Sequence, residues 1–358
     1  MSEGNRGQTE IVAVGRDDEP PLLSVSCLTY NQRDSIAAAL EGILAQQVPF
    51  GIEILVHDDA SSDGTAEIVR HYAAKNPSLF RPLYQAVNQY GLGVNPGILN
   101  RSRARGKYLA ICDGDDYWID PHKLRKQVEH LEAHPECGLV FTRIQRFHQA
   151  SGRMEPDFLS RDEKPPESFE DFLANTWLIP PSTWVVRSQF LERYNAQGLP
   201  KPGWLPGDFS MLLWLRKNHQ VHFLPDTTTV YRVLPQSVSH LRKPVEALRF
   251  RESVIEIVRH YSRDDAALSD RMVAFHLEKQ FYWFCRCADR ARIEEAYRQI
   301  GLHGQLKFHH RVFFLLSFSK HGMELVTWKR ALVRTLRLRA LWFFGGMSKF
   351  AGSTKLRA

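Results

Sequence analysis

Short apolar runs alternate with helical patterns along the first third of the chain. The runs cover residues 22–28, 52–56 and 107–112, and each is followed by a stretch with apolar side chains at helical spacing. Runs of this length predict buried strands, and a 3.6-residue apolar period predicts amphipathic helices. Strands that alternate with helices predict a mostly parallel sheet covered on both faces, so the expected fold class is α/β.

The later part of the chain has a different pattern. Between 151 and 206 prolines interrupt the pattern, strands are expected at 182–186, 221–224 and 227–233, and helices dominate beyond 243. The sequence therefore predicts a disordered polar leader at 1–20 and an α/β domain at 21–240, with halves at 21–120 and 121–240. A helical C-terminal region at 241–358 completes the expected organisation.

Composition indicates a globular protein from a reducing compartment. Apolar residues make up 43% of the chain and charged residues 24%, which excludes a disordered polymer. The five cysteines are odd in number and mostly lie in apolar runs, so we expect reduced thiols. Without a signal-peptide pattern or an apolar run of membrane-spanning length, we expect a cytoplasmic protein, either soluble or peripheral on the inner face of the membrane.

Positive charge is concentrated in the C-terminal tail. From residue 307 onward eleven Lys and Arg residues stand against Glu324 alone, although the whole chain carries only +7. This distribution argues against a nucleic-acid-binding protein. Residues 325–343 can be drawn as a helix with Arg330, Arg334 and Arg337 opposite an apolar face. The pattern is typical of a helix on an anionic membrane, and docking on the protein's own core is the alternative.

Carboxylates follow two of the predicted strands. Asp58 and Asp59 come after the second strand, and Asp113, Asp115 and Asp116 come after the third. The carboxyl ends of strands in an open α/β sheet form the crevice where ligands bind. So many carboxylates repel one another unless a cation neutralises them, and an oxygen-rich set favours Mg²⁺ or Mn²⁺. The alternative is that such turns cap helices, as Asp63 and Asp120 are expected to do.

Five motifs in order carry a resemblance to a known family. They are Thr29-Tyr30-Asn31, the segment 57–65 (HDDASSDGT), the segment 113–118 (DGDDYW), Pro206-Gly207-Asp208-Phe209 and the segment 231–239 (YRVLPQSVS). The first 240 residues thereby resemble a family 2 glycosyltransferase with the GT-A nucleotide-sugar fold. The resemblance implies a donor-binding half at 21–120 and an acceptor half at 121–240.

The resemblance also implies roles for single residues. Thr29, Tyr30 and Asn31 would bind the donor, and Tyr30 and Asp59 would contact the nucleotide base. Asp115 would contact the ribose or the metal, and Asp116 would coordinate the metal. Asp208 would act as the general base, with a plain N-cap of the following helix as the alternative. Leu234 stands where the family often has His, so we expect a weakly held metal.

The implied activity is inverting transfer of a sugar from a nucleotide-diphosphate donor, UDP being favoured. The implied acceptor is a glycan or lipid-linked molecule of cell-surface polysaccharide synthesis. Two alternatives stay open. A sugar nucleotidyltransferase would need a Gly-rich basic loop after the first strand, where this chain has 29–33 (TYNQR). A non-catalytic GT-A-fold binding protein at the membrane would have no need of Asp115, Asp116 and Asp208 together.

Two further segments have predicted roles. Residues 91–97 (GLGVNPG) superficially suggest a dinucleotide fingerprint, but their spacing is wrong. We expect a flexible loop over the donor site, because Pro96 interrupts the turn where a helix would have to begin. A basic run, Arg101, Arg103, Arg105 and Lys107, reads as a solvated face from which one side chain reaches the donor diphosphate.

Overall fold

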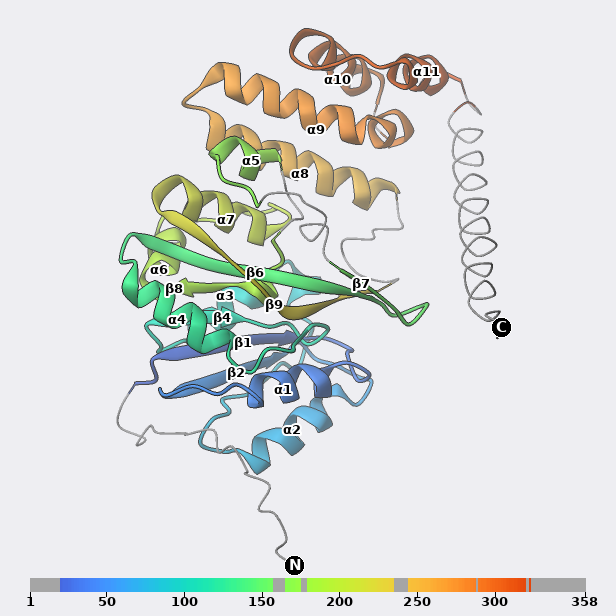
Figure 1. Ribbon diagram of the computed structural model, residues 1–358. Coiled ribbons are helices and arrows are strands. Elements are labelled where there is room, and N and C mark those ends of the chain that lie inside the picture. The colour runs from blue at the N-terminus through green and yellow to red at the C-terminus, as the bar shows by residue number, and fades with distance from the viewer. Residues whose placement is uncertain are drawn as a thin grey trace, which may run out of the picture. The chain divides into compact units, whose positions relative to one another are not determined.

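One sheet organises the N-terminal two thirds of the protein. The computed structural model describes residues 20–156, 165–174, 179–234, 244–287, 289–319 and 322. In this part of the chain the sheet has the order β3-β2-β1-β4-β8-β6-β9-β5, with β7 paired to β6 (Figure 1). The strands are β1 (Leu23–Thr29), β2 (Ile52–Asp58), β3 (Leu83–Tyr84), β4 (Tyr108–Ile111), β5 (Tyr117–Trp118), β6 (Cys137–His148), β7 (Arg153–Pro156), β8 (Val185–Arg187) and β9 (Gln220–Val233).

Helices cover the sheet and continue into the C-terminal region. Those before residue 220 are α1 (Ile36–Leu44), α2 (Thr65–Lys75), α3 (Pro96–Arg101), α4 (Lys123–Ala133), α5 (Phe169–Ala174), α6 (Ser188–Ala196) and α7 (Gly207–Asn218), with 3₁₀ turns η1 (Tyr90–Leu92) and η3 (Pro181–Thr183). The later ones are α8 (Pro244–Ser262), α9 (Ala266–Cys287), α10 (Arg290–His303) and α11 (Phe308–Ser317).

The main core lies where β1, β2 and β4 meet α1 and α4. All seven residues of β2 are buried, and Val25, Ile54 and Leu40 are fully buried in one cluster. On another side of these strands, Asn100 of α3 donates from its side chain to the Ser26 hydroxyl at 2.9 Å and to the Leu55 carbonyl at 2.8 Å. A fully buried amide with both donors satisfied fixes α3 against β1 and β2.

The expected α/β fold class is confirmed, and the sheet is mixed. β1 runs parallel to β2 and β4, and β2 runs parallel to β3. β8 is antiparallel to both β4 and β6, whereas β6 and β9 are parallel. The parallel character expected from the strand-helix alternation therefore holds for the half of the sheet built from β3, β2, β1 and β4.

Three local expectations are wrong. The strands expected at 221–224 and 227–233 are one strand, β9, whose pairing with β6 shifts register near Pro225. A bulge accommodates a proline, which has no N–H for the ladder. The strand expected at 182–186 starts only at Val185, after η3. Pro96 does not interrupt a turn but opens α3, capped by Asn95, which accepts from Gly97 N–H at 2.9 Å.

The chain divides into two compact units. The first consists of Met1–Leu241 with Glu256–Asp264, and the second of Arg242–Ile255 with Asp265–Ala358. Within the second unit α9 packs against α10 and α11. No helix in the described ranges is long and apolar enough to cross a membrane. All five cysteines are free. The leader, the motif residues 235–239 and the tail helix expected after 324 lie outside the described residues.

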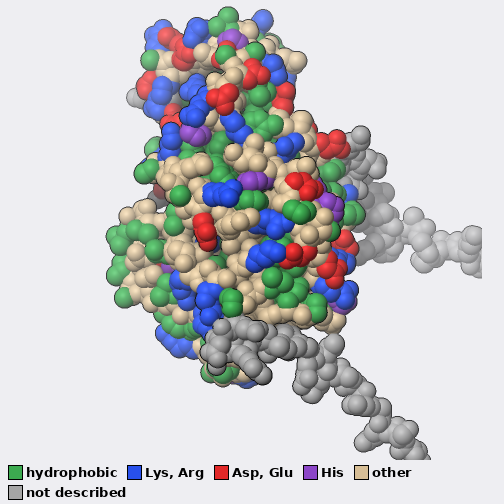
Figure 2. Space-filling view, turned by 90° about the vertical axis from the view of Figure 1, so that its left-hand side faces the viewer, with side chains coloured by type: hydrophobic (Ala, Val, Ile, Leu, Met, Phe, Trp, Pro, Cys, Tyr) green, Lys and Arg blue, Asp and Glu red, His purple; other side chains and the backbone are tan. Residues whose placement is uncertain are grey.

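Charge on the visible surface is mixed in sign. On the face shown in Figure 2, Lys and Arg side chains are interspersed with Asp and Glu. Ion pairs of the described chain include Lys107 with Glu132 at 2.7 Å and Arg292 with Glu252 at 2.7 Å. That face therefore lacks the single-sign stripe that marks a nucleic-acid-binding surface.

Candidate active site

Three strand ends meet at one edge of the sheet. Thr29 at the end of β1 is paired with Asp58 at the end of β2. Past these pairs, Asp59 N–H donates to the Thr29 carbonyl at 3.0 Å, and Gly114 N–H donates to the Leu28 carbonyl at 2.8 Å. The turns that follow β1, β2 and β4 are thus held side by side. Residues from three distant parts of the sequence share one crevice.

The first two turns are locked together through backbone in the left-handed region. Asn31 has φ 50° and Ala60 has φ 63°. Asn31 N–H donates to the Ser61 hydroxyl at 2.9 Å, and the Asn31 side-chain oxygen accepts from Ser62 N–H at 2.9 Å. Asn tolerates this conformation, but at Ala60 it costs about 1–2 kcal/mol. Strain of this kind persists where the surrounding structure enforces it, often at functional sites.

The predicted capping carboxylates bond amides at helix starts. Asp63 accepts from Thr65 N–H and from Arg33 N–H, both at 3.0 Å. Asp120 accepts from His122 N–H at 2.9 Å. The N-cap positions themselves are Gly64 and His122. These two carboxylates are therefore structural and contribute to positioning the turns around the crevice.

Asp59 anchors a neighbouring segment. It is buried, and its two oxygens accept from Gln89 N–H at 2.7 Å and from Tyr90 N–H at 3.0 Å. Tyr30 beside it is half exposed, whereas Thr29 is buried. A carboxylate that holds η1 in this way gives the crevice a fixed wall.

Asp116 is turned into the protein. It is only 5% exposed; its oxygens accept from the Ser182 hydroxyl at 2.7 Å and from Arg232 N–H at 2.9 Å. Burial raises its pKa well above the usual range, and Asp115 raises it further. These bonds tie the turn after β4 to η3 and to the far end of β9.

Asp113 and Asp208 share an electrostatic environment with Arg101, and Asp115 acts on Asp113. Burial, followed by the charge of Asp115, raises the pKa of Asp113 to about 7, and Asp208 adds to that rise. Burial also raises the pKa of Asp115 and of Asp208. Arg101 of α3 counteracts the rise at Asp113 and at Asp208. Carboxyls at 113–115 and at 208, far apart in sequence, therefore interact in the folded chain.

Asp208 lies in the first turn of α7 and is not its N-cap. The N-cap is Pro206, so the alternative assignment of Asp208 as a cap is wrong. Its Oδ1 accepts from Phe209 N–H at 2.8 Å. The apolar residues that follow, including Phe209 and Leu213, are buried against the unit, which leaves Asp208 on a rigid element.

Buried polar atoms without a hydrogen-bond partner gather at this edge. In the described part of the chain they include Thr29 Oγ1, Gln32 Oε1, Asp58 Oδ1, Arg101 Nε, Asp113 Oδ1 and Arg232 Nε. Native proteins rarely bury such atoms unpaired. A polar ligand fits the crevice, and the unpartnered Asp113 oxygen beside further carboxylates suits a hard divalent cation.

Sequence reasoning missed several of these residues. Gln32 hydrogen-bonds Asp115, and its place next to the Thr29-Tyr30-Asn31 motif was the available signal. Arg101 was grouped with a solvated basic run but is the member that lies among the carboxylates. Ser182 carried no signal at all, because its contact with Asp116 spans 66 residues.

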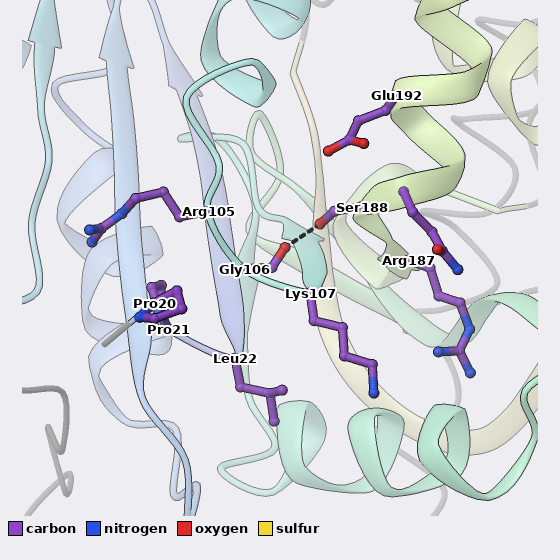
Figure 3. A pocket seen from close by; sticks show the side chains of 10 residues that line it. Pro20, Pro21, Leu22, Arg105, Gly106, Lys107, Arg187, Ser188 and Glu192 are labelled. Atoms are coloured by element: carbon purple, nitrogen blue, oxygen red, sulfur yellow. Dashed lines mark hydrogen bonds between the residues drawn. The ribbon is translucent and has the colours of Figure 1, made fainter. Parts of the chain in front are cut away.

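A cavity of about 520 Å³ lies elsewhere, among the N-terminal ends of β1 and β4. Leu22, Lys107 and Ser188 are among its lining residues (Figure 3), and the Ser188 hydroxyl donates to the Gly106 carbonyl at 2.6 Å. Two of its cations are paired, Arg105 with Glu53 and Lys107 with Glu132. It lies at the opposite end of these strands from the carboxylates and is not part of the crevice.

Solved structures share the fold. S. aureus TarS 1-349 in complex with UDP aligns with TM-score 0.54 and 17% identity, covering 84% of this chain and 82% of that one. The mannosyltransferase PcManGT from Pyrobaculum calidifontis, in complex with GDP-Man and Mn²⁺, aligns with TM-score 0.52 and 16% identity, covering 86% and 87%. At these identities the likeness concerns the fold alone.

The relatives found by sequence include a protein named as a glycosyltransferase. An uncharacterized protein of Mycobacterium tuberculosis (strain H37Rv) is 33% identical over 219 residues, which is 61% of this chain and 60% of that protein. TuaG of Bacillus subtilis (strain 168), named as a candidate teichuronic acid biosynthesis glycosyltransferase, is 30% identical over 156 residues, 44% of this chain and 58% of TuaG. The chain thus spans about 60% of the length of these relatives.

The family model covers the whole crevice. The model for glycosyl transferase family 2 matches residues 24–233, a span that runs from β1 to the end of β9 and contains every carboxylate described above. The match extends over more than half of the chain. The protein belongs to glycosyl transferase family 2.

Proposed function

We propose that this protein is a metal-dependent, inverting glycosyltransferase that takes a sugar from a nucleotide-diphosphate donor, UDP being favoured. The observation that carries the proposal is the carboxylate crevice, in which Asp113 interacts with Asp115, Asp208 and Arg101 beside unpartnered polar atoms. A divalent cation held by these carboxylates would offset their negative charge and allow the crevice to accept the negatively charged diphosphate of the donor. The wall made by Thr29, Tyr30, Asn31 and Asp59 would receive the nucleoside.

The metal site is proposed at the turn after β4. Asp115 would provide one ligand oxygen to Mg²⁺ or Mn²⁺. The earlier prediction that Asp116 is the second ligand stays a prediction. Because both Asp116 oxygens already accept hydrogen bonds, Asp113, with its unpartnered Oδ1, is the stronger candidate. When bound, the cation would balance the charge that develops on the departing diphosphate.

The protein's own groups would perform the proton transfer. Asp208 would accept the proton of an acceptor hydroxyl as that oxygen attacks the anomeric carbon from the face opposite the diphosphate. The bond from that carbon to the diphosphate oxygen breaks, and the nucleoside diphosphate departs. Burial raises the pKa of Asp208, which brings this base closer to the operating pH. A single displacement of this kind inverts the anomeric configuration.

Donor hydrolysis tests the activity directly. Purified protein with Mn²⁺ is incubated with a panel of UDP-, GDP- and dTDP-sugars, and the released nucleoside diphosphate is measured with and without excess chelator. We expect slow, chelator-sensitive hydrolysis of one donor class. Asp113→Asn and Asp115→Asn should lose Mn²⁺-dependent donor binding, and comparison with Asp116→Asn assigns the second ligand.

The non-catalytic alternative makes the opposite prediction. A GT-A-fold binding protein would bind the nucleotide sugar in calorimetry but release no nucleoside diphosphate over hours. A nucleotidyltransferase would instead release pyrophosphate from a nucleoside triphosphate and a sugar phosphate. Either result would replace the proposed reaction.

The acceptor and location are proposed from the relatives and from charge. TuaG is named for teichuronic acid biosynthesis, a cell-surface polymer, and we propose a glycan or lipid-linked acceptor of that general class for this chain. The basic C-terminal tail, with eleven Lys and Arg residues after 306, would hold the protein at an anionic membrane on the cytoplasmic side, where such acceptors are presented.

A further inference from the structure

Three histidines converge at a place remote from the carboxylate crevice. His130 lies in the last turn of α4, His134 is the residue that ends that helix, and His222 lies near the start of β9. One potential ligand atom from each lies within 4.8 Å of the others. All three side chains are partly exposed, so an ion can reach them from solvent.

The outer nitrogens of two rings have protein partners. His134 Nδ1 lies 2.9 Å from the His130 carbonyl, to which it can only donate. His222 Nε2 lies 2.8 Å from the Gln220 side-chain oxygen. These bonds place the proton on the outer nitrogen and leave the other nitrogen, Nε2 of His134 and Nδ1 of His222, as a lone pair. Metal-binding histidines are held by the same kind of outer hydrogen bond.

The distance between the facing nitrogens of His130 and His222 is close to the distance between two nitrogens bound to one metal ion. His130 Nε2 and His222 Nδ1 are 2.7 Å apart and share a hydrogen bond. Two nitrogens bound to one tetrahedral Zn²⁺ at about 2.0–2.1 Å lie about 3.3 Å apart. A widening of about half an ångström, with the His130 proton moved from Nε2 to Nδ1, would replace the hydrogen bond by two metal bonds to neutral rings.

The surroundings of His130 and His222 favour their neutral forms. Burial, followed by the neighbouring rings, lowers the pKa of His130, and burial followed by His134 lowers the pKa of His222. The charge of Glu136 opposes both of these pKa shifts. The nearby Arg187 guanidinium donates hydrogen bonds to the Leu131 and His134 carbonyls. Neutral imidazoles are the form that binds a metal.

We propose that His130, His134 and His222 form a zinc site that clips the end of α4 to the start of β9. Three imidazoles suit a borderline ion such as Zn²⁺, in contrast to the oxygen ligands of the crevice. The fourth position would hold water. His222 is separated from Arg232, which bonds Asp116, by ten residues of strand, or about 30 Å. The proposed ion is therefore structural and independent of sugar transfer.

Zinc titration of the tag-free, full-length protein tests the site. The protein is stripped with chelator, dialysed, and held in excess Mg²⁺ so that the carboxylate crevice is occupied. Calorimetry at pH 7.5 should show about one Zn²⁺ per chain, and the melting temperature should rise with Zn²⁺. Co²⁺ should give the visible absorption bands of a tetrahedral nitrogen-ligated ion.

Variants decide whether these residues carry the binding. His222→Gln and His130→Gln should each lose at least tenfold in Zn²⁺ affinity and lose the thermal shift, with unchanged circular dichroism. His71→Gln, an exposed histidine of α2, is the matched control and should bind as the original chain does. Asp115→Asn should also keep the zinc site. Absence of stoichiometric Zn²⁺ binding and of Co²⁺ bands in the original chain, or full retention in His222→Gln, would overturn the proposal.

Discussion

At the scale of single residues, a substitution at Asp208 distinguishes a catalytic role of this residue from a structural one. It lies in the first turn of α7, where a negative charge contributes about 0.3–1 kcal/mol through the helix dipole. Asp208→Asn should therefore cost little stability. If Asp208 is the base, the same change should leave donor binding intact and slow transfer by about 10²–10⁴-fold. Calorimetry for donor affinity and steady-state kinetics for transfer provide the two readouts, with Asp34→Asn as an exposed control. Transfer at the original rate would refute the role of Asp208.

Lys123 gives a second prediction at this scale, one about pH. It is fully buried, donates to the Gln127 side-chain oxygen at 2.6 Å and lies 4.5 Å from the Trp118 ring centre. Burial lowers its pKa to about 7. Between about pH 7 and 10 the unfolded chain therefore binds the proton that the folded chain has released. The free energy of unfolding should rise with pH across that window, by up to about 1.4 kcal/mol per unit.

Denaturant unfolding at pH 6, 7, 8 and 9 measures this effect. Below pH 7 both states carry the proton, so this group adds no pH dependence there. Lys123→Met should flatten the rise above pH 7, whereas Lys75→Met, an exposed change on α2, should leave it in place. Parallel pH curves for the original chain and Lys123→Met would contradict the assignment of the shifted proton to this residue.

The carboxylates of the site could be predicted from the sequence more readily than the contacts that they make in the folded chain. Asp58, Asp59, Asp113 and Asp115 lie at strand ends as expected, because an apolar run followed by acidic residues marks a strand end locally. The link between Asp116 and Ser182, and that of Arg101 with Asp208, depends on how distant segments pack. Hydrophobic pattern carries no information about such pairs. The roles of the site residues themselves stay predictions.

At the scale of elements, α1 meets β5 at a glycine. A Cβ added to Gly42 would lie 2.7 Å from the Trp118 carbonyl oxygen and 2.9 Å from its backbone nitrogen. Backbone cannot move aside as a side chain can, so Gly42→Ala should force α1 away from β5. Overpacking of this kind typically costs about 1–3 kcal/mol. Because β5 directly follows the Asp113-to-Asp116 turn, donor affinity should fall as well.

Thermal unfolding and donor calorimetry of Gly42→Ala check both effects. Ala38→Ser on the same helix, at a partly exposed position, is the control and should change neither quantity appreciably. A Gly42→Ala protein with the original melting temperature would show that α1 and β5 can separate without loss.

Strands and helices could be predicted from the sequence where one apolar pattern continues along the whole element. β1, β2 and β4 form from clear apolar runs, and their ends lie within two residues of the expected bounds. The sequence predicts two strands on either side of Pro225, whereas a bulge carries the pairing of the single strand β9 past it. The sequence does not predict α3, because Pro96 resembles a helix breaker, whereas at the first helical position its fixed φ favours the helix.

At the scale of the whole molecule, charge in the tail makes the membrane proposal testable in the full-length chain. Each Lys or Arg near an anionic surface contributes about 1 kcal/mol. The triple change Arg330→Gln, Arg334→Gln and Arg337→Gln should therefore weaken binding to phosphatidylserine-containing vesicles by about 100-fold, measured by co-sedimentation in low salt. Removing the same charge at Arg70, Arg125 and Arg193 should have little effect. Equal losses for the two triple variants would indicate non-specific attraction.

The last turns of α8 bear on how the protein can be shortened. Tyr261 shares a hydrogen bond with the Ser210 hydroxyl at 3.2 Å, and that hydroxyl accepts from Tyr194 at 2.9 Å. Lys217 donates to Asp264 at 2.6 Å, and the His260 ring packs edge-on against Trp204. Glu256–Asp264 thus belongs to the same compact unit as α7, although the family model ends at residue 233.

Anyone who trims the gene at the family boundary would remove the residues that cover α7, the helix that carries Asp208. A protein ended at residue 240 should expose Trp204 and Tyr194, aggregate during expression, and bind ANS, while one ended at residue 265 should be recovered in larger soluble yield. Domain libraries that recombine C-terminal regions among relatives should therefore place their crossover after Asp264, because an earlier crossover would exchange part of the compact unit that carries Asp208 along with the region meant to vary.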